Sequence, residues 1–191
     1  MSTLLFDLFK FSKLLDLSNG QMSLMNTPVN VVPTYLMCEQ QRMLIEQLGF
    51  KDAYEKIYAY AKKGSFEYNS EFMKREKFSD KRKTIDWQTK LFAFAGWGEL
   101  DRAFTDFNNT RFIAHFKNAP YPKSYGPAKY PVDFIGAGLI AGGLSALVGT
   151  DLDSVETKCV SRGDAFCEIE TNKPDITKKL KAELWKTWGI A

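Results

Sequence analysis

Apolar side chains recur three and four positions apart in several stretches of the chain, which is the spacing of one helix face. In the first half, the stretches with this spacing are residues 1–11, 34–48, 52–63 and 80–95. A glycine follows each of the last three, and glycine commonly ends helices. We therefore predict four helices before residue 96, one of them ending at Gly64. The face of the helix over 80–95 combines Ile85, Gln88, Leu91 and Phe92.

Two other stretches predict antiparallel hairpins. Asn19-Gly20 separates two short segments with apolar positions, and both turn residues tolerate positive φ. Residues 98–107 and 110–116 flank Asn108-Asn109, and a two-residue turn would place Asp106 opposite Arg111. The same register puts five residues on the face expected in the core, namely Ala103, Phe107, Phe112, Ala114 and Phe116.

The last third predicts a loop, a helix, a hairpin and a helix. Four prolines mark residues 117–131 as a loop. A helix over 132–148 follows, and then strands near 152–160 and 165–170 around the turn 161–164. The final helix begins near Pro174, and its expected buried stripe is Ile176, Leu180, Leu184 and Trp188.

Together these elements predict an α+β fold. Residues 1–191 are expected to form a single domain, in which an antiparallel sheet built from hairpins packs against about five helices. The N-terminal hairpin and helices occupy 1–96, and the motifs discussed below lie within 131–171.

Composition and charge exclude several classes of protein. With 45% hydrophobic residues the chain is expected to fold, and its net charge of +3 is too small and dispersed to favour nucleic-acid binding. The longest apolar run, 134–148, is shorter than the ~20 residues of a membrane span. The N-terminus lacks signal-peptide features, and three cysteines do not make a disulfide scaffold. We therefore expect a cytoplasmic protein with reduced thiols.

The helix over 132–148 is made largely of small residues. Gly138, Gly142 and Ala146 lie four positions apart, so another backbone or a ligand can approach this side closely. The same segment contains Gly136-x-Gly138-x-x-Ala141, which fits the dinucleotide-binding fingerprint. That alternative is disfavoured because the strand before it would be very short and too little chain follows for a doubly wound sheet.

Three motifs in this region point to one family. They are the segment FIGAGLIAGGL at 134–144, the pattern Glu156-x-x-Cys159 followed by Gly163-Asp164-x-x-Cys167, and the closing strand Cys167-Glu-Ile-Glu. The chain resembles the 4-vinyl reductase domain family over its last third and only loosely before it. The resemblance implies a fold related to subunits of the TRAPP vesicle-tethering complex and to NO-signalling ligand-binding domains. It also implies a homodimer formed through helices, for which the N-terminal helix and exposed parts of 34–63 are the expected interface.

A candidate zinc site follows from the resemblance. Metal-binding members of the family hold zinc with a Glu and two Cys at the positions of Glu156, Cys159 and Cys167. Their fourth ligand is a Cys where this chain has Asp133, a change that should weaken the site. Glu156 and Cys159 converge only if a bulge separates them, since residues three apart in a strand face opposite sides. The alternative is that both cysteines pack as small hydrophobic side chains. Any metal here would be structural.

His115 is the only histidine and thus the only partner for a Cys–His nucleophile pair. The hairpin register places it opposite Arg102 and away from the core face, so a partly exposed structural histidine is favoured. We find no paired-carboxylate, Ser-triad or phosphate-loop arrangement.

The many aromatic residues between 87 and 116 predict a core that can contain an apolar pocket. Sensor members of the family hold an aromatic effector between the small-residue helix and the sheet. The expected lining residues are Trp97, Phe112, Phe134 and Ala137.

The chain is therefore expected to be a non-catalytic binding domain for a small hydrophobic molecule, acting through a protein partner. The alternatives are a ligand-free scaffold protein like the TRAPP subunits, or an accessory factor in tetrapyrrole metabolism.

Overall fold

The computed structural model describes residues 15–24, 26–76 and 80–190, and the helix predicted over 1–11 lies outside them. The described helices are α2 (Thr34–Leu48), α3 (Phe50–Glu76), α4 (Lys81–Phe94), α5 (Pro120–Tyr125), α6 (Phe134–Val148) and α7 (Pro174–Thr187). A small antiparallel sheet contains β1 (Leu15–Ser18), β2 (Gln21–Leu24) and β3 (Thr27–Val29). The main antiparallel sheet contains β4 (Glu99–Asp106), β5 (Arg111–Lys117), β6 (Asp153–Lys158) and β7 (Cys167–Asn172). The predicted α+β class is confirmed.

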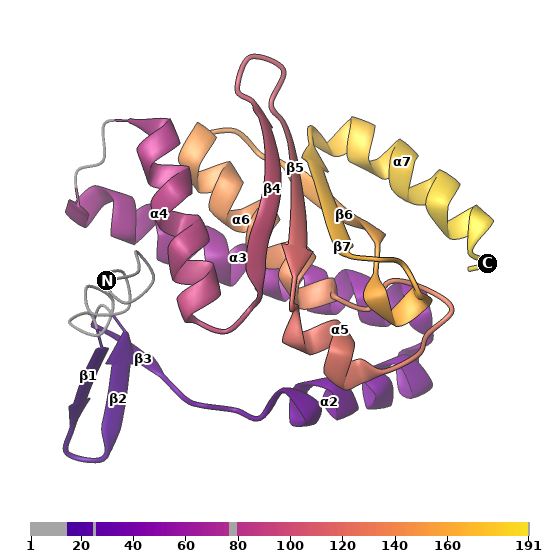
Figure 1. The fold of residues 1–191 in the computed structure, drawn as a ribbon, viewed down its shortest axis with the longest axis horizontal. Coiled ribbons are helices and arrows are strands. Elements are labelled where there is room, and N and C mark those ends of the chain that lie inside the picture. Colours follow the sequence, from indigo (N-terminus) through magenta and orange to yellow (C-terminus); the bar gives the residue numbers. More distant parts are fainter. Residues whose placement is uncertain (1–14, 25, 77–79, 191) are drawn as a thin grey trace.

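The main sheet has the strand order β4-β5-β7-β6, so two hairpins join side by side through β5 and β7. Helix α6 lies behind it, α4 lies to the side next to β4, α3 lies behind α6, and α7 lies beside β6 (Figure 1). The main core fills the space between α6, α5, α2 and the sheet, and includes Phe116, Tyr121, Val132 and Ile169. None of the described helices is both long and apolar enough to span a membrane.

The register expected for the first hairpin of the main sheet is observed. Asp106 pairs with Arg111, and Arg102 pairs with His115. In the second hairpin the ladder shifts between Glu156 and Lys158, which is the bulge expected between Glu156 and Cys159. A short 3-10 turn, Val160–Arg162, then leads toward β7.

The prediction that a helix would end at Gly64 was wrong, because α3 continues through it to Glu76. An interior glycine costs a helix about 1 kcal/mol relative to alanine, so packing must offset that cost. The residue after it, Ser65, donates a hydrogen bond to the Leu139 carbonyl of α6 at 2.6 Å, and α3 packs along α6 more extensively than any other pair of elements. Tertiary contacts thus extend the helix beyond the point where the sequence predicts its end.

Smaller differences concern edges and surfaces. Strand β3 was not predicted, and the loop expected over 117–131 contains α5. Ile176 and Ala103, both expected to be buried, are exposed, and Ala103 lies on the edge strand β4.

Candidate functional site

An apolar cavity of about 440 Å³ lies between the main sheet and the helices behind it. Helix α6 contributes Leu139, Ile140, Gly143 and Leu144, and β5 contributes Phe112, Ala114 and Phe116. Further lining residues come from α3, α4, β4, β7 and the small sheet, among them Ser65, Asn69, Gln88, Phe92, Leu24 and Thr171. Every lining residue among those described is uncharged.

The structure brings together two of the four residues expected in the pocket. Trp97 and Phe112 line the cavity. Phe134 and Ala137 lie elsewhere on α6, in a separate cluster with Tyr54 and Tyr58 of α3. The ring centroids of Phe134 and Tyr54 are 5.0 Å apart. Because α6 is apolar on all sides, helical spacing alone does not indicate which of its faces meets the cavity.

The glycines of α6 allow close contact with α3, as the sequence predicted. A Cβ built on Gly138 would lie 2.6 Å from the Tyr58 carbonyl oxygen. A Cβ on Gly142 would overlap the Lys62 carbonyl oxygen and lie 2.8 Å from the Phe66 nitrogen. The glycines therefore serve helix packing. The residues directly before α6 form no strand, so the context of a dinucleotide-binding turn is missing.

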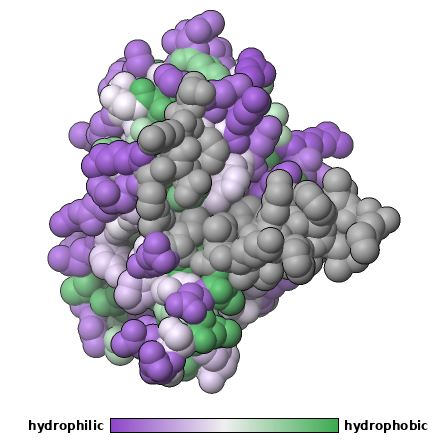
Figure 2. Space-filling model, turned by 90° about the vertical axis from the view of Figure 1, so that its left-hand side faces the viewer, coloured by the Kyte–Doolittle hydropathy of each residue, from purple (hydrophilic) through white to green (hydrophobic). Residues whose placement is uncertain are grey.

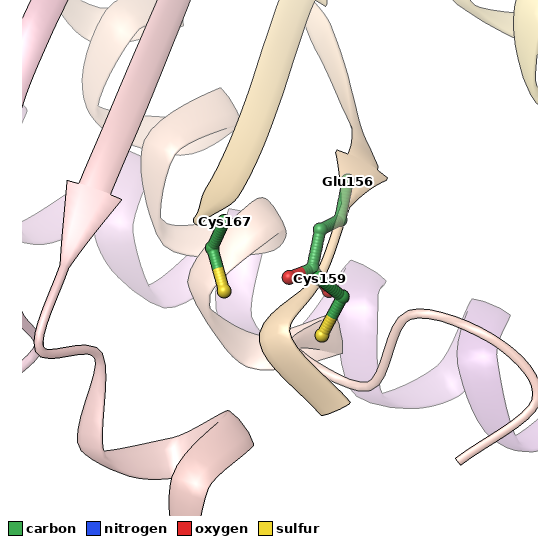
Figure 3. Close-up of side chains that lie close together, drawn as sticks. All are labelled: Glu156, Cys159 and Cys167. Carbon is green, nitrogen blue, oxygen red and sulfur yellow. The ribbon is translucent and has the colours of Figure 1, made fainter. Parts of the chain in front are cut away.

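The residues of the candidate metal centre converge at the turn end of the second hairpin. Figure 3 shows Glu156 extending from β6, Cys159 from the turn that follows it, and Cys167 from the start of β7. All three are buried, and their ligand atoms lie within 4.8 Å of one another. Ligands of one tetrahedral zinc are about 3.5 Å apart, given zinc–ligand distances of about 2.0–2.3 Å, so a small contraction would close the site.

The chemistry of this cluster fits a cation. Glu156 Oε1 is buried and has no hydrogen-bond partner among the described residues. Burial, together with the neighbouring Cys159 thiol and Asp133 carboxyl, raises the pKa of Glu156 well above its usual value. The hydrogen bond with Cys167 and burial raise the pKa of Cys159. A divalent cation would stabilise the deprotonated forms of these groups.

Asp133 lies beside this cluster and makes contacts of its own. Its Oδ1 accepts a hydrogen bond from the Gly136 nitrogen at 2.8 Å and caps α6, while its backbone N–H donates to Glu156 Oε2 at 2.9 Å. A Cβ at position 136 would lie 2.6 Å from the Asp133 carboxyl carbon, so this arrangement requires a glycine there. Burial raises the pKa of Asp133 to about 6.

His115 lies on the outer face of the sheet, away from the cysteines. Its ring stacks on Phe166 with centroids 4.6 Å apart, and its Nε2 lies 2.7 Å from Glu168 Oε2. Arg102 pairs with His115 across the strands, as the register predicts. The charged group that contacts the imidazole ring, however, is the Glu168 carboxylate. These contacts agree with the partly exposed histidine that the register predicts.

Comparisons with known proteins relate part of the chain to a family and its fold to solved structures. The family model of the 4-vinyl reductase domain matches residues 113–173. The resemblance to this family is confirmed. A search of curated proteins found no significant match.

Three solved structures show the same fold at low sequence identity. The phenol-responsive sensory domain of the transcription activator PoxR, solved with phenol, has a TM-score of 0.78 at 17% identity, with 96% of both chains covered. A vinyl-4-reductase family protein from Methanocaldococcus jannaschii has a TM-score of 0.51 at 17% identity, covering 75% of this chain and 83% of its own. Subunit 3 of the trafficking protein particle complex from Naegleria fowleri, covalently bound to palmitic acid, has a TM-score of 0.54 at 16% identity, covering 73% and 93%.

Proposed function

We propose that this chain is a sensory or carrier domain that binds a small hydrophobic molecule between its sheet and helix α6. The observation that carries the proposal is the uncharged, mainly apolar cavity of about 440 Å³ in this position. Pockets of about 300–1,000 Å³ with such linings are typical of small-molecule sites. The structural similarity to a phenol-responsive sensory domain over nearly the whole chain supports this proposal.

The cavity volume sets the size of the ligand. A cavity of roughly 150 Å³ accommodates benzene, and this one is about three times larger. It therefore suits a molecule of two or three rings, or a chain of comparable volume. The described residues of the lining include no pair of acid and base. Binding itself is the proposed activity, and its output passes to a protein partner.

Filling the cavity tests the proposal. Leu144 of α6 lines the cavity, and Leu144→Trp should abolish binding of naphthalene-sized probes because the indole occupies their space. Ile176→Trp, on the exposed surface of α7, is the matched control and should bind as the wild type does. Isothermal titration calorimetry measures both. Equal affinity in both variants would contradict the cavity as the site, and a wild type that binds no probe would favour the scaffold alternative.

The proposal includes a structural zinc held by Glu156, Cys159 and Cys167, with Asp133 as the candidate fourth ligand. Bound zinc would tie β6, the 3-10 turn and β7 together at the end of the hairpin next to the start of α6. Asp133 would have to share its carboxylate between the cap of α6 and the metal. Such a site is expected to be weaker than one with three thiolates.

A homodimer through α2 completes the proposal. Val32, Leu36 and Met43 are exposed at helical spacing on one face of α2 or directly before it, and Tyr35 lies beside them with 60% of its surface exposed. Figure 2 looks onto the side of the molecule that carries α4 and the N-terminal hairpin. Among the coloured residues in this view, hydrophilic ones predominate, and hydrophobic ones lie low in the view and near its top.

A further inference from the structure

Three polar side chains that line the cavity form one hydrogen-bonded relay. Ser65 Oγ donates to the Leu139 carbonyl oxygen at 2.6 Å. Asn69 Nδ2 donates to the Ser65 carbonyl oxygen at 2.8 Å and contacts Ser65 Oγ at 3.2 Å. Gln88 Nε2 of α4 then donates to Asn69 Oδ1 at 2.9 Å. The relay therefore connects α6, α3 and α4 across one wall of the cavity.

The partners of the relay fix the orientation of both amides. The Ser65 carbonyl is an acceptor only, so Asn69 must turn its NH₂ group toward it and its oxygen toward Gln88. Gln88 must then donate to that oxygen with its own NH₂ group. The Gln88 Oε1 atom consequently points away from Asn69, and no hydrogen bond to it is observed within the described part of the chain.

We propose, building on the proposed function, that Gln88 Oε1 is the specificity-determining acceptor of the cavity and that the ligand is an uncharged molecule with one hydroxyl or N–H donor. The acceptor selects a donor group on the ligand. The uncharged lining rejects ions, because an ion buried without a partner carries a large desolvation penalty. Asn69 and Ser65 act as positioning residues that hold the Gln88 amide in this orientation.

Three probes of nearly equal size test separately the preference for a donor group and the rejection of ions. 2-Naphthol carries one hydroxyl donor, 2-methylnaphthalene carries none, and 2-naphthoate is an anion at neutral pH. Calorimetry on the full chain should give 2-naphthol an affinity about three- to tenfold higher than that of 2-methylnaphthalene, the range expected for one neutral hydrogen bond. 2-Naphthoate should bind most weakly.

Substitution of Gln88 tests its role directly. Gln88→Met keeps the length and helix propensity of the side chain but removes the acceptor. The affinities for 2-naphthol and 2-methylnaphthalene should then be about equal. Affinity for 2-methylnaphthalene should stay the same or rise, which also shows that the cavity remains folded. Asn69→Leu should reduce the preference in the same direction. Gln47→Met makes the same substitution at an exposed glutamine of α2 outside the cavity and should leave the preference unchanged.

The outcomes distinguish the two proposals. If the wild type binds none of the probes, the proposed function fails and this inference fails with it. If it binds 2-naphthol and 2-methylnaphthalene equally, or if Gln88→Met keeps the preference, the cavity binds ligands but Gln88 does not select them. Tightest binding of 2-naphthoate would overturn the uncharged ligand class.

Discussion

At the residue scale, neighbouring tyrosines of α3 differ in how their hydroxyl groups are satisfied. The rings of Tyr54 and Tyr58 stack with centroids 5.6 Å apart. Tyr58 donates to Asp153 Oδ1 at 2.9 Å and accepts from the Ser154 nitrogen at 2.8 Å. The Tyr54 hydroxyl is buried and makes no hydrogen bond to any described residue. The hydrogen-bonded Tyr58 hydroxyl is therefore expected to stabilise the fold, whereas the buried Tyr54 hydroxyl is expected to destabilise it.

Removal of each hydroxyl should show this difference. Tyr54→Phe should raise the free energy of unfolding by about 1 kcal/mol, because an unsatisfied buried polar group is removed. Tyr58→Phe should lower it by about 1–3 kcal/mol, because the Ser154 nitrogen and the Asp153 carboxylate both lose a partner. Urea denaturation measures both values. Equal effects in the two variants would contradict the contacts described for Tyr58.

The candidate metal centre gives a second prediction at this scale. Native mass spectrometry of the purified chain should show one zinc per chain, lost in Cys159→Ser. Cys38→Ser is the matched control, since Cys38 is also a buried free thiol but lies outside the cluster. Asp133→Cys should retain zinc against a chelator for longer than the wild type, because a thiolate binds zinc more tightly than a carboxylate. A wild-type mass without added metal would mean that the cysteines are packing residues.

At the element scale, the hairpins were predicted more accurately than the helix ends. Hairpin registers depend on turn residues and on alternation, both of which are local, and the pairs Asp106–Arg111 and Arg102–His115 are both observed. The end of α3 depends on its contact with α6, which is distant in the sequence, so Gly64 gave the wrong boundary. The sequence required a bulge after Glu156 only if Glu156 and Cys159 were to converge, and the ladder does shift between Glu156 and Lys158.

Separation along the chain also decides how much of the candidate site the sequence can place. The glutamic acid and cysteines of the hairpin lie close in the sequence, and they also meet in the structure. The cavity is formed by elements far apart in the sequence, and only Trp97 and Phe112 of the four expected residues line it. The sequence does contain one sign of Gln88, because it is a polar residue on the apolar face of the helix over 80–95. A polar residue at such a position indicates a polar group in the interior, and Gln88 does line the cavity.

The two adjacent glycines of α6 give a prediction about how elements pack. Gly142→Ala should destabilise the protein by about 1–3 kcal/mol, because its Cβ would overlap the backbone of α3 at Lys62. Gly143→Ala should be neutral or stabilising by up to about 1 kcal/mol, since its Cβ would meet Asn69 no closer than 3.4 Å and alanine favours the helix. Thermal denaturation compares the two. A similar loss of stability in both would show that α6 tolerates no added methyl group, whatever it faces.

At the scale of the whole molecule, the order of the elements along the sequence was enough to predict the fold class. Association of the chain with a second copy cannot be observed in the structure of one chain.

The exposed apolar residues of α2 lead to a prediction about that association. Sedimentation velocity should show a dimer, and Leu36→Glu combined with Met43→Glu should dissociate it, because both side chains are exposed on one face of α2. Ile176→Glu, an exposed position on α7, should leave the dimer intact. A monomeric wild type would remove α2 as an interface.

The close approach of α3 and α6 also limits how this protein can diverge in sequence. On the side of α6 that faces α3, any residue larger than glycine at positions 138 or 142 meets backbone atoms, which cannot move aside as a side chain can. The opposite walls of the cavity, on α4 and β4, consist of side chains that can change one at a time. New ligand preferences are therefore expected to arise through substitutions in α4 and β4, while the α3–α6 pair stays the same among descendants that bind different molecules.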